Sequence, residues 1–358
     1  MIASKHPPWS KSAQNDKPDQ PAERCVFVIA EAGVNHNGDL EIATKLIDAA
    51  ANAGADAVKF QTFKAESLVS ANAPMAEYQR ANVPGASNQF EMLQRLELDA
   101  KAHNILLAHC RKRNIEFLST PFDDASVDLL VELGVRAIKV SSGDLTNHLL
   151  LEHIAGKRLP VILSTGMATV EEIERATLVF QRTRDADLAI LHCVSAYPAA
   201  ESDANLLVIP MLKERFGFPV GWSDHTRGDV TAIVAVGLGA AIIEKHITLD
   251  NSLQGPDHKA SMEPAAFADY VRDLRIATAS LGSGLKQPTA AEKEMALMAR
   301  RSLAAARHIN AGEKLTRDML CAIRPGTGLP PYALDRMLGK RALVDIKCNV
   351  LLDPGMFS

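Results

Sequence analysis

The stretch GWSDHTRGDVTAIVAVGLGAAIIEKHITLD, residues 221–250, holds two short apolar runs with a helical pattern between them. Each run ends in a histidine among charged or hydroxyl side chains, SDHT around His225 and EKHIT around His246. The runs are continuous rather than alternating, which is typical of strands buried on both faces of a parallel sheet. The stretch therefore predicts a β-α-β unit with polar groups where its strands end.

The same succession of a short apolar run and a longer helical pattern occurs eight times between Cys25 and about Leu281. Strands that alternate with helices predict a parallel sheet with right-handed crossovers. Eight such units in about 250 residues predict an α/β fold, the (β/α)8 TIM barrel. A doubly wound open sheet is the alternative, but no GxGxxG motif follows the first strand to favour it.

The segments outside the predicted barrel differ from it in amino-acid composition and in the pattern of predicted elements. Residues 1–23 are polar and lack an apolar core, so we expect a disordered leader before a barrel of residues 24–282. Residues 283–299 are expected to be a polar, alanine-rich linker with a helical turn. Short β runs broken by Gly and Pro then predict a small domain over residues 300–358.

The composition excludes several partners. Lys and Arg total 39 against 43 Asp and Glu, a net charge of −4, which gives no case for nucleic acid or an anionic membrane. The five cysteines are scattered and form no CxxC pair, so isolated, buried thiols are expected rather than disulfides or zinc ligands. No apolar run approaches the ~20 residues that span a bilayer. We therefore expect a cytoplasmic protein.

Polar residues stand at the end of every predicted strand, where a barrel of this kind carries its chemistry. Alternate residues of a strand share a face, so Lys59 and Gln61 point the same way, as do Glu244 and His246. Lysines inside a barrel need an anion as partner. The polar residues at the ends of the first six strands are Glu31, Lys59, Gln61, Ser119, Thr120, Lys139, Ser141, Ser142, Asp144, Ser164, Thr165, His192, Ser195 and Tyr197.

These residue types indicate two kinds of ligand. Lys59 and Lys139 suit a small dianion, because lysine binds phosphate as a point charge and hydroxyls add directional hydrogen bonds. His225 and His246, on adjacent strands, suit a divalent metal. Glu31 is expected near His246, since the first strand adjoins the eighth in a closed barrel. The hydroxyls are those of Thr120, Ser142, Ser164 and Ser223.

The order of motifs along the chain carries a family resemblance. The motifs are IAEAGVNHNGDL, GADAVKFQTFKAE, FLSTPFD, IKVSSGD, PVILSTGMA, LHCVSAYP, GWSDHT, IEKHIT and GPDHKASMEP. Together they resemble the sialic acid synthase family, over nearly the whole chain after residue 24. The C-terminal RRSLAAARHINAGEKLT, with a later RPGTG, resembles the antifreeze-like (SAF) domain of that family.

The resemblance implies an activity and a set of contacts. Family members make nonulosonic acids by condensing phosphoenolpyruvate with an open-chain N-acylated amino sugar, releasing phosphate by C–O cleavage. His225 and His246 are the implied ligands of Mn²⁺, for which Mg²⁺ or Co²⁺ can substitute. The implied phosphoenolpyruvate contacts are Lys59, Thr120, Lys139, Ser142, Ser164 and Ser223.

The remaining roles are also implied by the resemblance. Arg324, in the RPG turn of the small domain, would reach into the barrel of the other subunit of a domain-swapped homodimer and meet the N-acetyl group of the sugar. Asp144 is the candidate for proton handling near C2 of phosphoenolpyruvate. The other implied sugar contacts are Gln61, Tyr197 and Asp257, and the catalytic set is Glu31, Lys59, Lys139 and Asp144.

The identity of the sugar stays open between alternatives. N-acetylmannosamine, which gives N-acetylneuraminate, is the first expectation. The AEYQ run in the loop after the second strand, together with GPDHKAS, resembles legionaminate-type synthases, which would use 2,4-diacetamido-2,4,6-trideoxymannose. Ser195 stands where some sialate synthases have Asn. A pseudaminate synthase is a further alternative.

Other functions fit the strand ends less well. Synthases acting on phosphorylated aldoses need a second, arginine-rich phosphate site, and no arginine stands at these strand ends. A metal-dependent hydrolase would need more ligands on the early strands, where His36 is expected to be a loop residue. A carbohydrate- or ice-binding scaffold is the non-enzyme alternative, but the many Arg and Lys residues between 300 and 347 make a poor ice surface.

Overall fold

The computed structural model describes Trp9 and residues 25–83, 85–182 and 187–358. The chain divides into two compact units, Met1–Ser283 and Gly284–Ser358. The expectation of a disordered leader over residues 1–23 falls outside the described residues except at Trp9. That side chain is buried, and its ring lies edge-on to Phe27 with ring centroids 4.4 Å apart.

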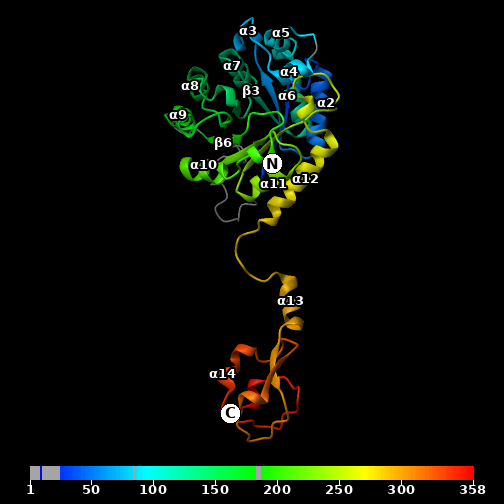
Figure 1. Ribbon diagram of the computed structural model, residues 1–358, viewed down its shortest axis with the longest axis vertical. Helices are drawn as coiled ribbons and strands as arrows, with labels where there is room; N and C mark the ends of the chain where they lie inside the picture. The colour runs from blue at the N-terminus through cyan, green and yellow to red at the C-terminus, as the bar shows by residue number, and fades with distance from the viewer. Residues whose placement is uncertain (1–8, 10–24, 84, 183–186) are drawn as a thin grey trace. The chain divides into compact units, whose positions relative to one another are not determined.

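The first unit, in the upper part of Figure 1, is built on one sheet of eight parallel strands. The strands are β1 (Phe27–Gly33), β2 (Ala57–Thr62), β3 (Glu116–Pro121), β4 (Ile138–Val140), β5 (Val161–Ser164), β6 (Leu188–Cys193), β7 (Val220–Asp224) and β8 (Ile242–His246). The hydrogen-bonded order is β3-β2-β1-β8-β7-β6-β5-β4, and β3 and β4 lie side by side. The predicted (β/α)8 barrel is confirmed.

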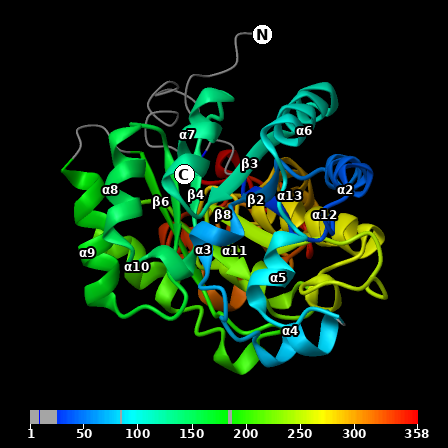
Figure 2. The same cartoon turned by 90° about the horizontal axis from the view of Figure 1, so that it is seen from above.

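Helices surround the strands on the outside, as the view along the barrel shows (Figure 2). Aspartates begin several of them: Asp39, Asp99 and Asp123 each accept hydrogen bonds from backbone N–H groups of the first turn. The helices are α2 (Leu40–Asn52), α6 (Ala100–Arg113), α7 (Asp124–Glu132), α8 (His148–Gly156), α9 (Val170–Gln181), α10 (Val208–Phe216), α11 (Val230–Gly237) and α12 (Pro264–Ser280).

Inward-facing residues change from apolar to polar along the strands. In β1, Phe27 and Ile29 belong to a buried apolar cluster, whereas Glu31 lines a cavity at the carboxyl end. β8 repeats the pattern from Ile242 to Glu244. The amino-terminal part of the barrel is therefore a packed core, and the carboxyl-terminal part holds a polar cavity.

The segment between β2 and β3 contains more helical structure than one crossover helix. Three short helices precede α6, and Asp99 starts α6 as a new helix. Figure 1 shows α3 and α5 at the end of the barrel toward which the strand arrows point. The short helices are α3 (Ala65–Leu68), α4 (Glu77–Asn82) and α5 (Gln89–Gln94).

The second unit has a small core and one two-stranded antiparallel sheet. Its strands are β9 (Ser302–Ala305) and β10 (Leu320–Ile323). Helix α13 (Ala290–Ala299) begins with a capping box between Thr289 and Glu292, so this part of the predicted linker is a ten-residue helix rather than a single turn. A further short helix is α14 (Leu334–Met337).

Single turns of 3₁₀ helix complete the described structure. They are η1 (Ser142–Asp144), η2 (Glu201–Asp203), η3 (His258–Ala260), η4 (Arg317–Met319), η5 (Pro331–Ala333) and η6 (Pro354–Met356). Within the described ranges, none of the helices has the length and apolar character needed to cross a membrane. The five cysteines are free, as expected, but Cys25 and Cys348 are exposed rather than buried.

Candidate active site

A cavity of about 570 Å³ lies at the carboxyl ends of the strands, and all eight strands contribute to its lining. That volume is in the range of small-molecule sites. The sequence-predicted residues that line it are Glu31, Lys59, Gln61, Thr120, Lys139, Ser142, Ser164, Tyr197, Ser223, His225, His246 and Asp257.

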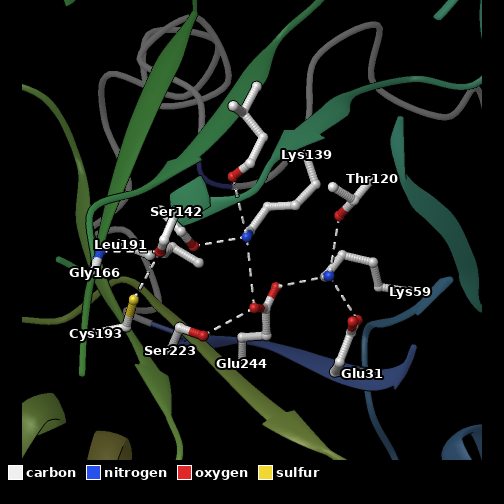
Figure 3. Close-up of polar contacts among 12 residues, drawn as sticks. Glu31, Lys59, Thr120, Lys139, Ser142, Gly166, Leu191, Cys193, Ser223 and Glu244 are labelled. Atoms are coloured by element: carbon white, nitrogen blue, oxygen red, sulfur yellow. Dashed lines mark hydrogen bonds and ion pairs between the residues drawn. The ribbon is translucent and has the colours of Figure 1, made fainter. Parts of the chain in front are cut away.

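Four buried charged side chains line this cavity and contact one another (Figure 3). Lys59 Nζ lies 2.6 Å from Glu31 Oε2 and 3.8 Å from Glu244 Oε2. Lys139 Nζ lies 3.6 Å from Glu244 Oε1. We call Glu31, Lys59, Lys139 and Glu244 the ion-pair cluster. Its two cations and two carboxylates neutralise one another, which explains how four ionisable groups are tolerated inside the barrel.

Burial and mutual attraction set the protonation of the cluster. Burial raises the pKa of Glu31 to about 7, although Lys59 attracts its carboxylate. For Glu244, attraction to Lys139 and Lys59 outweighs burial and lowers the pKa to about 2. Burial lowers the pKa of Lys139, whereas the two carboxylates more than offset burial at Lys59 and raise its pKa. Glu31 is therefore the member that titrates near neutral pH.

Hydroxyl groups surround the two ammonium groups. Lys139 Nζ donates to Ser164 Oγ at 2.7 Å, and Lys59 Nζ donates to Thr120 Oγ1 at 3.2 Å. Ammonium groups with neighbouring hydroxyls can bind an anion that has several oxygens, because both kinds of group donate hydrogen bonds to it.

The loop after β5 lies close to residues at the ends of β4 and β6. The backbone N–H of Gly166 donates to Ser142 Oγ at 2.9 Å. A Cβ atom at Gly166 would lie 2.2 Å from Ser195 Oγ and 2.8 Å from Cys193 Sγ. The lack of a Cβ at Gly166 therefore lets the loop after β5 pack closely against the side chains of Cys193 and Ser195.

The two histidines lie together at the rim, with ring centroids 5.6 Å apart. His225 Nδ1 lies 2.7 Å from the Val194 carbonyl oxygen and so carries the proton, which leaves Nε2 with a free lone pair. His246 Nδ1 is buried and has no hydrogen-bond partner among the described residues. Burial lowers the pKa of both imidazoles, so both are neutral at pH 7.

Neutral imidazoles with free nitrogens fit a divalent transition metal. The carbonyl bond to His225 is the kind of outer contact that orients a metal ligand. Within the described residues, no group of three or more His, Cys, Asp and Glu side chains is placed to hold an ion. The residues therefore fit a metal held by two imidazoles, with its other positions left to water or substrate oxygens.

Three further predicted residues line the cavity beside the histidines. The Tyr197 ring lies 4.3 Å from the ring of His225, measured between centroids. Burial raises the pKa of Asp257 to about 6. Gln61 Nε2 donates to Glu31 Oε1 at 3.5 Å. This side offers hydrogen-bonding groups to a polar ligand.

The structure does not bring every predicted residue to the cavity. Asp144 lies in η1, where Oδ2 accepts from Ser141 Oγ at 2.6 Å, and it is not part of the lining. His192 stands near the end of β6 as predicted but does not line the cavity, because its ring lies against Trp222 and Nε2 contacts the Ala204 carbonyl at 2.8 Å. Arg324 belongs to the second unit, where it is exposed directly after β10.

Two parts of the site were missed from the sequence. Glu244 shares the inward face of β8 with His246, and the same two-residue spacing that pairs Lys59 with Gln61 indicates that it lines the cavity. The apolar lining from the segment between β2 and α6 has no such periodicity, so nothing in its sequence indicated which side chains turn inward.

Known proteins resemble this chain over almost its full length. A model of the NeuB family matches residues 46–286, and a model of the SAF domain matches residues 300–358. N,N'-diacetyllegionaminic acid synthase of Legionella pneumophila is 44% identical over 94% of this chain and 95% of its own. The synthase of the same name from Campylobacter jejuni is 44% identical over 91% of this chain and 98% of its own.

A solved structure supports the same relationship. N-acetylneuraminic acid synthetase of Leptospira borgpetersenii, crystallised with citrate, superposes with a TM-score of 0.68 at 40% identity. The match covers 76% of this chain and 90% of that one.

Proposed function

Because the chain belongs to the NeuB family, we propose that it is a nonulosonic acid synthase that condenses phosphoenolpyruvate with 2,4-diacetamido-2,4,6-trideoxymannose. The products would be N,N'-diacetyllegionaminic acid and phosphate. The choice of sugar follows the two relatives at 44% identity. It replaces N-acetylmannosamine, the first expectation from the sequence, which the less similar Leptospira relative would favour.

One observation carries the proposal: two buried lysines, a ring of hydroxyls and a neutral histidine pair line a single cavity. Phosphoenolpyruvate would lie against Lys59 and Lys139, which offset the charge of its carboxylate and phosphate. The hydroxyls of Ser164 and Thr120 already bond to these lysines and would orient the phosphate oxygens. Ser142 and Ser223 complete the proposed contacts.

A divalent ion, proposed as Mn²⁺ with Mg²⁺ or Co²⁺ as substitutes, would be held by His225 and His246. When bound, it would supply a Lewis acid that polarises the aldehyde oxygen of the open-chain sugar. Gln61, Tyr197 and Asp257 would position the sugar hydroxyls and amides beside it.

The proposed reaction joins C3 of phosphoenolpyruvate to the aldehyde carbon of the sugar. Water adds to C2, and the phosphate leaves with its bridging oxygen when the C–O bond breaks. Glu31, with a pKa of about 7, can hold or release a proton at neutral pH beside Lys59. Asp144 lies outside the cavity lining, so a proton role for it requires movement of η1.

The second unit would act through a neighbouring copy of the chain. We propose a domain-swapped homodimer in which Arg324 meets the N-acetyl group of the sugar in the partner's barrel. A cytoplasmic location belongs to the same proposal.

The decisive experiment mixes the full-length protein with phosphoenolpyruvate, Mn²⁺ and each candidate sugar, and measures phosphate release. We expect the highest kcat/KM with the diacetamido sugar. Phosphoenolpyruvate labelled with ¹⁸O in the bridging position should deliver the label to phosphate. An absence of release with every amino sugar would refute the enzymatic proposal, and a preference for N-acetylmannosamine would refute the choice of sugar.

A further inference from the structure

One side of the cavity is apolar, and the reaction proposed above uses none of it. The side chains come from the segment between β2 and α6 and from the residue after β3. We call this set the apolar wall, and it consists of Leu68, Val69, Met92, Leu93, Leu96 and Phe122.

The apolar wall is a packed structure. Met92, Leu93 and Leu96 are buried in an apolar cluster with Phe63 beneath them. Phe63 in turn meets Phe122 edge-on, with ring centroids 6.1 Å apart. Because these side chains hold one another in place, the wall offers a ligand a preformed surface.

Half-buried members of the wall leave apolar surface for a ligand. Leu68, Val69 and Phe122 pack against the buried cluster with one side and line the cavity with the other. Two amide side chains, Gln79 and Gln89, line the cavity as well. A surface that mixes methyl-sized apolar patches with amides matches an acetamido group, which has a methyl end and an amide end.

Hydrogen bonds tie this segment to the loop that carries Asp257. Asn82 Nδ2 donates to the Pro256 carbonyl oxygen at 3.3 Å, and Gly255 N–H donates to the Asn82 carbonyl at 3.2 Å. At the other end of the segment, Ala65 N–H donates to Glu97 Oε1 at 2.8 Å. The wall therefore holds a fixed position beside the proposed sugar contacts.

We propose that the apolar wall determines which amino sugar is used, by receiving the C6 methyl and the second acetamido methyl of a 2,4-diacetamido-2,4,6-trideoxy sugar. N-acetylmannosamine carries hydroxyls at both places, and a hydroxyl against this surface loses its bonds to water without replacement. The inference rests on the proposed function and adds the residues that decide specificity. Apolar surfaces of this kind discriminate by about 10- to 200-fold.

The test introduces polarity into the half-buried part of the wall. Val69→Thr adds a hydroxyl at constant shape, and Leu68→Asn replaces an apolar end with an amide. Leu149→Asn is the matched control, since Leu149 is 83% exposed on α8 and does not line the cavity. Steady-state kcat/KM is measured for both sugars, together with the KM for phosphoenolpyruvate.

We expect the variant that combines Leu68→Asn with Val69→Thr to lose at least about tenfold in kcat/KM for the diacetamido sugar. N-acetylmannosamine should change less than threefold, or improve, and the KM for phosphoenolpyruvate should stay constant. Equal losses for both sugars would overturn the role of the wall while leaving the proposed function intact. Wild-type protein that releases phosphate with neither sugar would overturn both.

A measurement on the unmodified protein guards against variants that fail to fold. Saturation-transfer NMR of the diacetamido sugar with the full chain should give the strongest transfer to its C6 methyl and 4-acetamido methyl protons. Stronger transfer to the ring protons than to these methyls would contradict the inference.

Discussion

At the scale of single residues, each cavity histidine follows a charged residue that points to the other side of the sheet. Asp224 precedes His225, Lys245 precedes His246, and the two charges pair at 2.9 Å from registered positions on β7 and β8. Tyr270 OH also donates to Asp224, at 3.0 Å. This buried pair lies behind the histidines and fixes their strands in register.

Breaking that pair should affect both stability and metal binding. Asp224→Asn leaves Lys245 buried without a countercharge, so we expect the free energy of unfolding to fall by about 3 kcal/mol in urea titrations. Mn²⁺ affinity should fall about tenfold, because the histidines lose their support. Asp269→Asn, in an exposed pair with Arg272, should cost less than about 1 kcal/mol. Wild-type Mn²⁺ affinity in Asp224→Asn would limit the pair to a structural role.

Removing a proposed metal ligand should have a larger effect on the ion. His225→Ala should weaken Mn²⁺ binding by more than about 100-fold, since losing a ligand exceeds the effect of losing its supporting bond. Electron paramagnetic resonance of free Mn²⁺ measures this without an activity assay. His148→Ala, at an exposed position on α8, is the control. Turnover that persists in chelator would contradict the metal assignment.

At the scale of elements, the loops after β1 and β8 depend on neutral, buried histidines. His36 Nδ1 accepts from Gly38 N–H at 2.9 Å, and His258 Nδ1 lies 2.7 Å from Thr248 Oγ1. Burial, reinforced at His36 by the neighbouring His103, lowers the pKa of both imidazoles to about 4. Protonation of His36 would remove the acceptor of the Gly38 N–H, so this loop is expected to weaken when the imidazole becomes charged.

Acid should destabilise the protein through these loops. The folded pKa lies below the unfolded value near 6.5, so the unfolded chain binds more protons between pH 6.5 and about 4. Stability is full above pH 6.5 and falls with pH by up to about 1.4 kcal/mol per pH unit for each histidine. His36→Asn should reduce the slope of the free energy of unfolding against pH by the contribution of one histidine. The exposed His148→Asn should leave that slope unchanged. The free energy of unfolding is measured by urea titration at several pH values across this range. The same pH dependence in the wild type and in His36→Asn would contradict the role of His36.

The sequence predicted the regular elements and the polar ends of the strands for a common reason. Strand residues alternate in direction, so Lys59 and His246 could be assigned to the interior from their spacing alone. Asp144 lies in a 3₁₀ turn after its strand, where the alternation no longer applies. The sequence does not predict the apolar wall. Met92 and Leu96 are turned inward by the packing of short helices, which leaves no regular spacing of apolar residues in the sequence.

At the scale of the whole molecule, the proposed function assigns a role to each unit of the chain. Arg324 is exposed and makes no ion pair within the described residues. Its guanidinium is thus available to a carbonyl oxygen of a substrate. A homodimer would allow the second unit of one copy to serve the barrel of another, and light scattering of the full chain tests that state.

Arg324→Ala should therefore act on the sugar more than on phosphoenolpyruvate. We expect the KM for the sugar to rise about tenfold, the loss of one charge-assisted hydrogen bond, with little change in the KM for phosphoenolpyruvate. Arg336→Ala, in α14 of the same unit, is the control. An unchanged KM for the sugar would remove Arg324 from the site.

The ion-pair cluster has a thermodynamic consequence. Glu31 and Glu244 pair with the two ammonium groups to which phosphoenolpyruvate is proposed to bind. On that proposal, the substrate would have to displace these carboxylates in order to bind. If Lys59 then bound the substrate instead, Glu31 would lose its countercharge and would take up a proton from the solvent. Binding heat would then vary with the ionisation enthalpy of the buffer, and occupancy at limiting substrate would respond to acidity even before any bond is made.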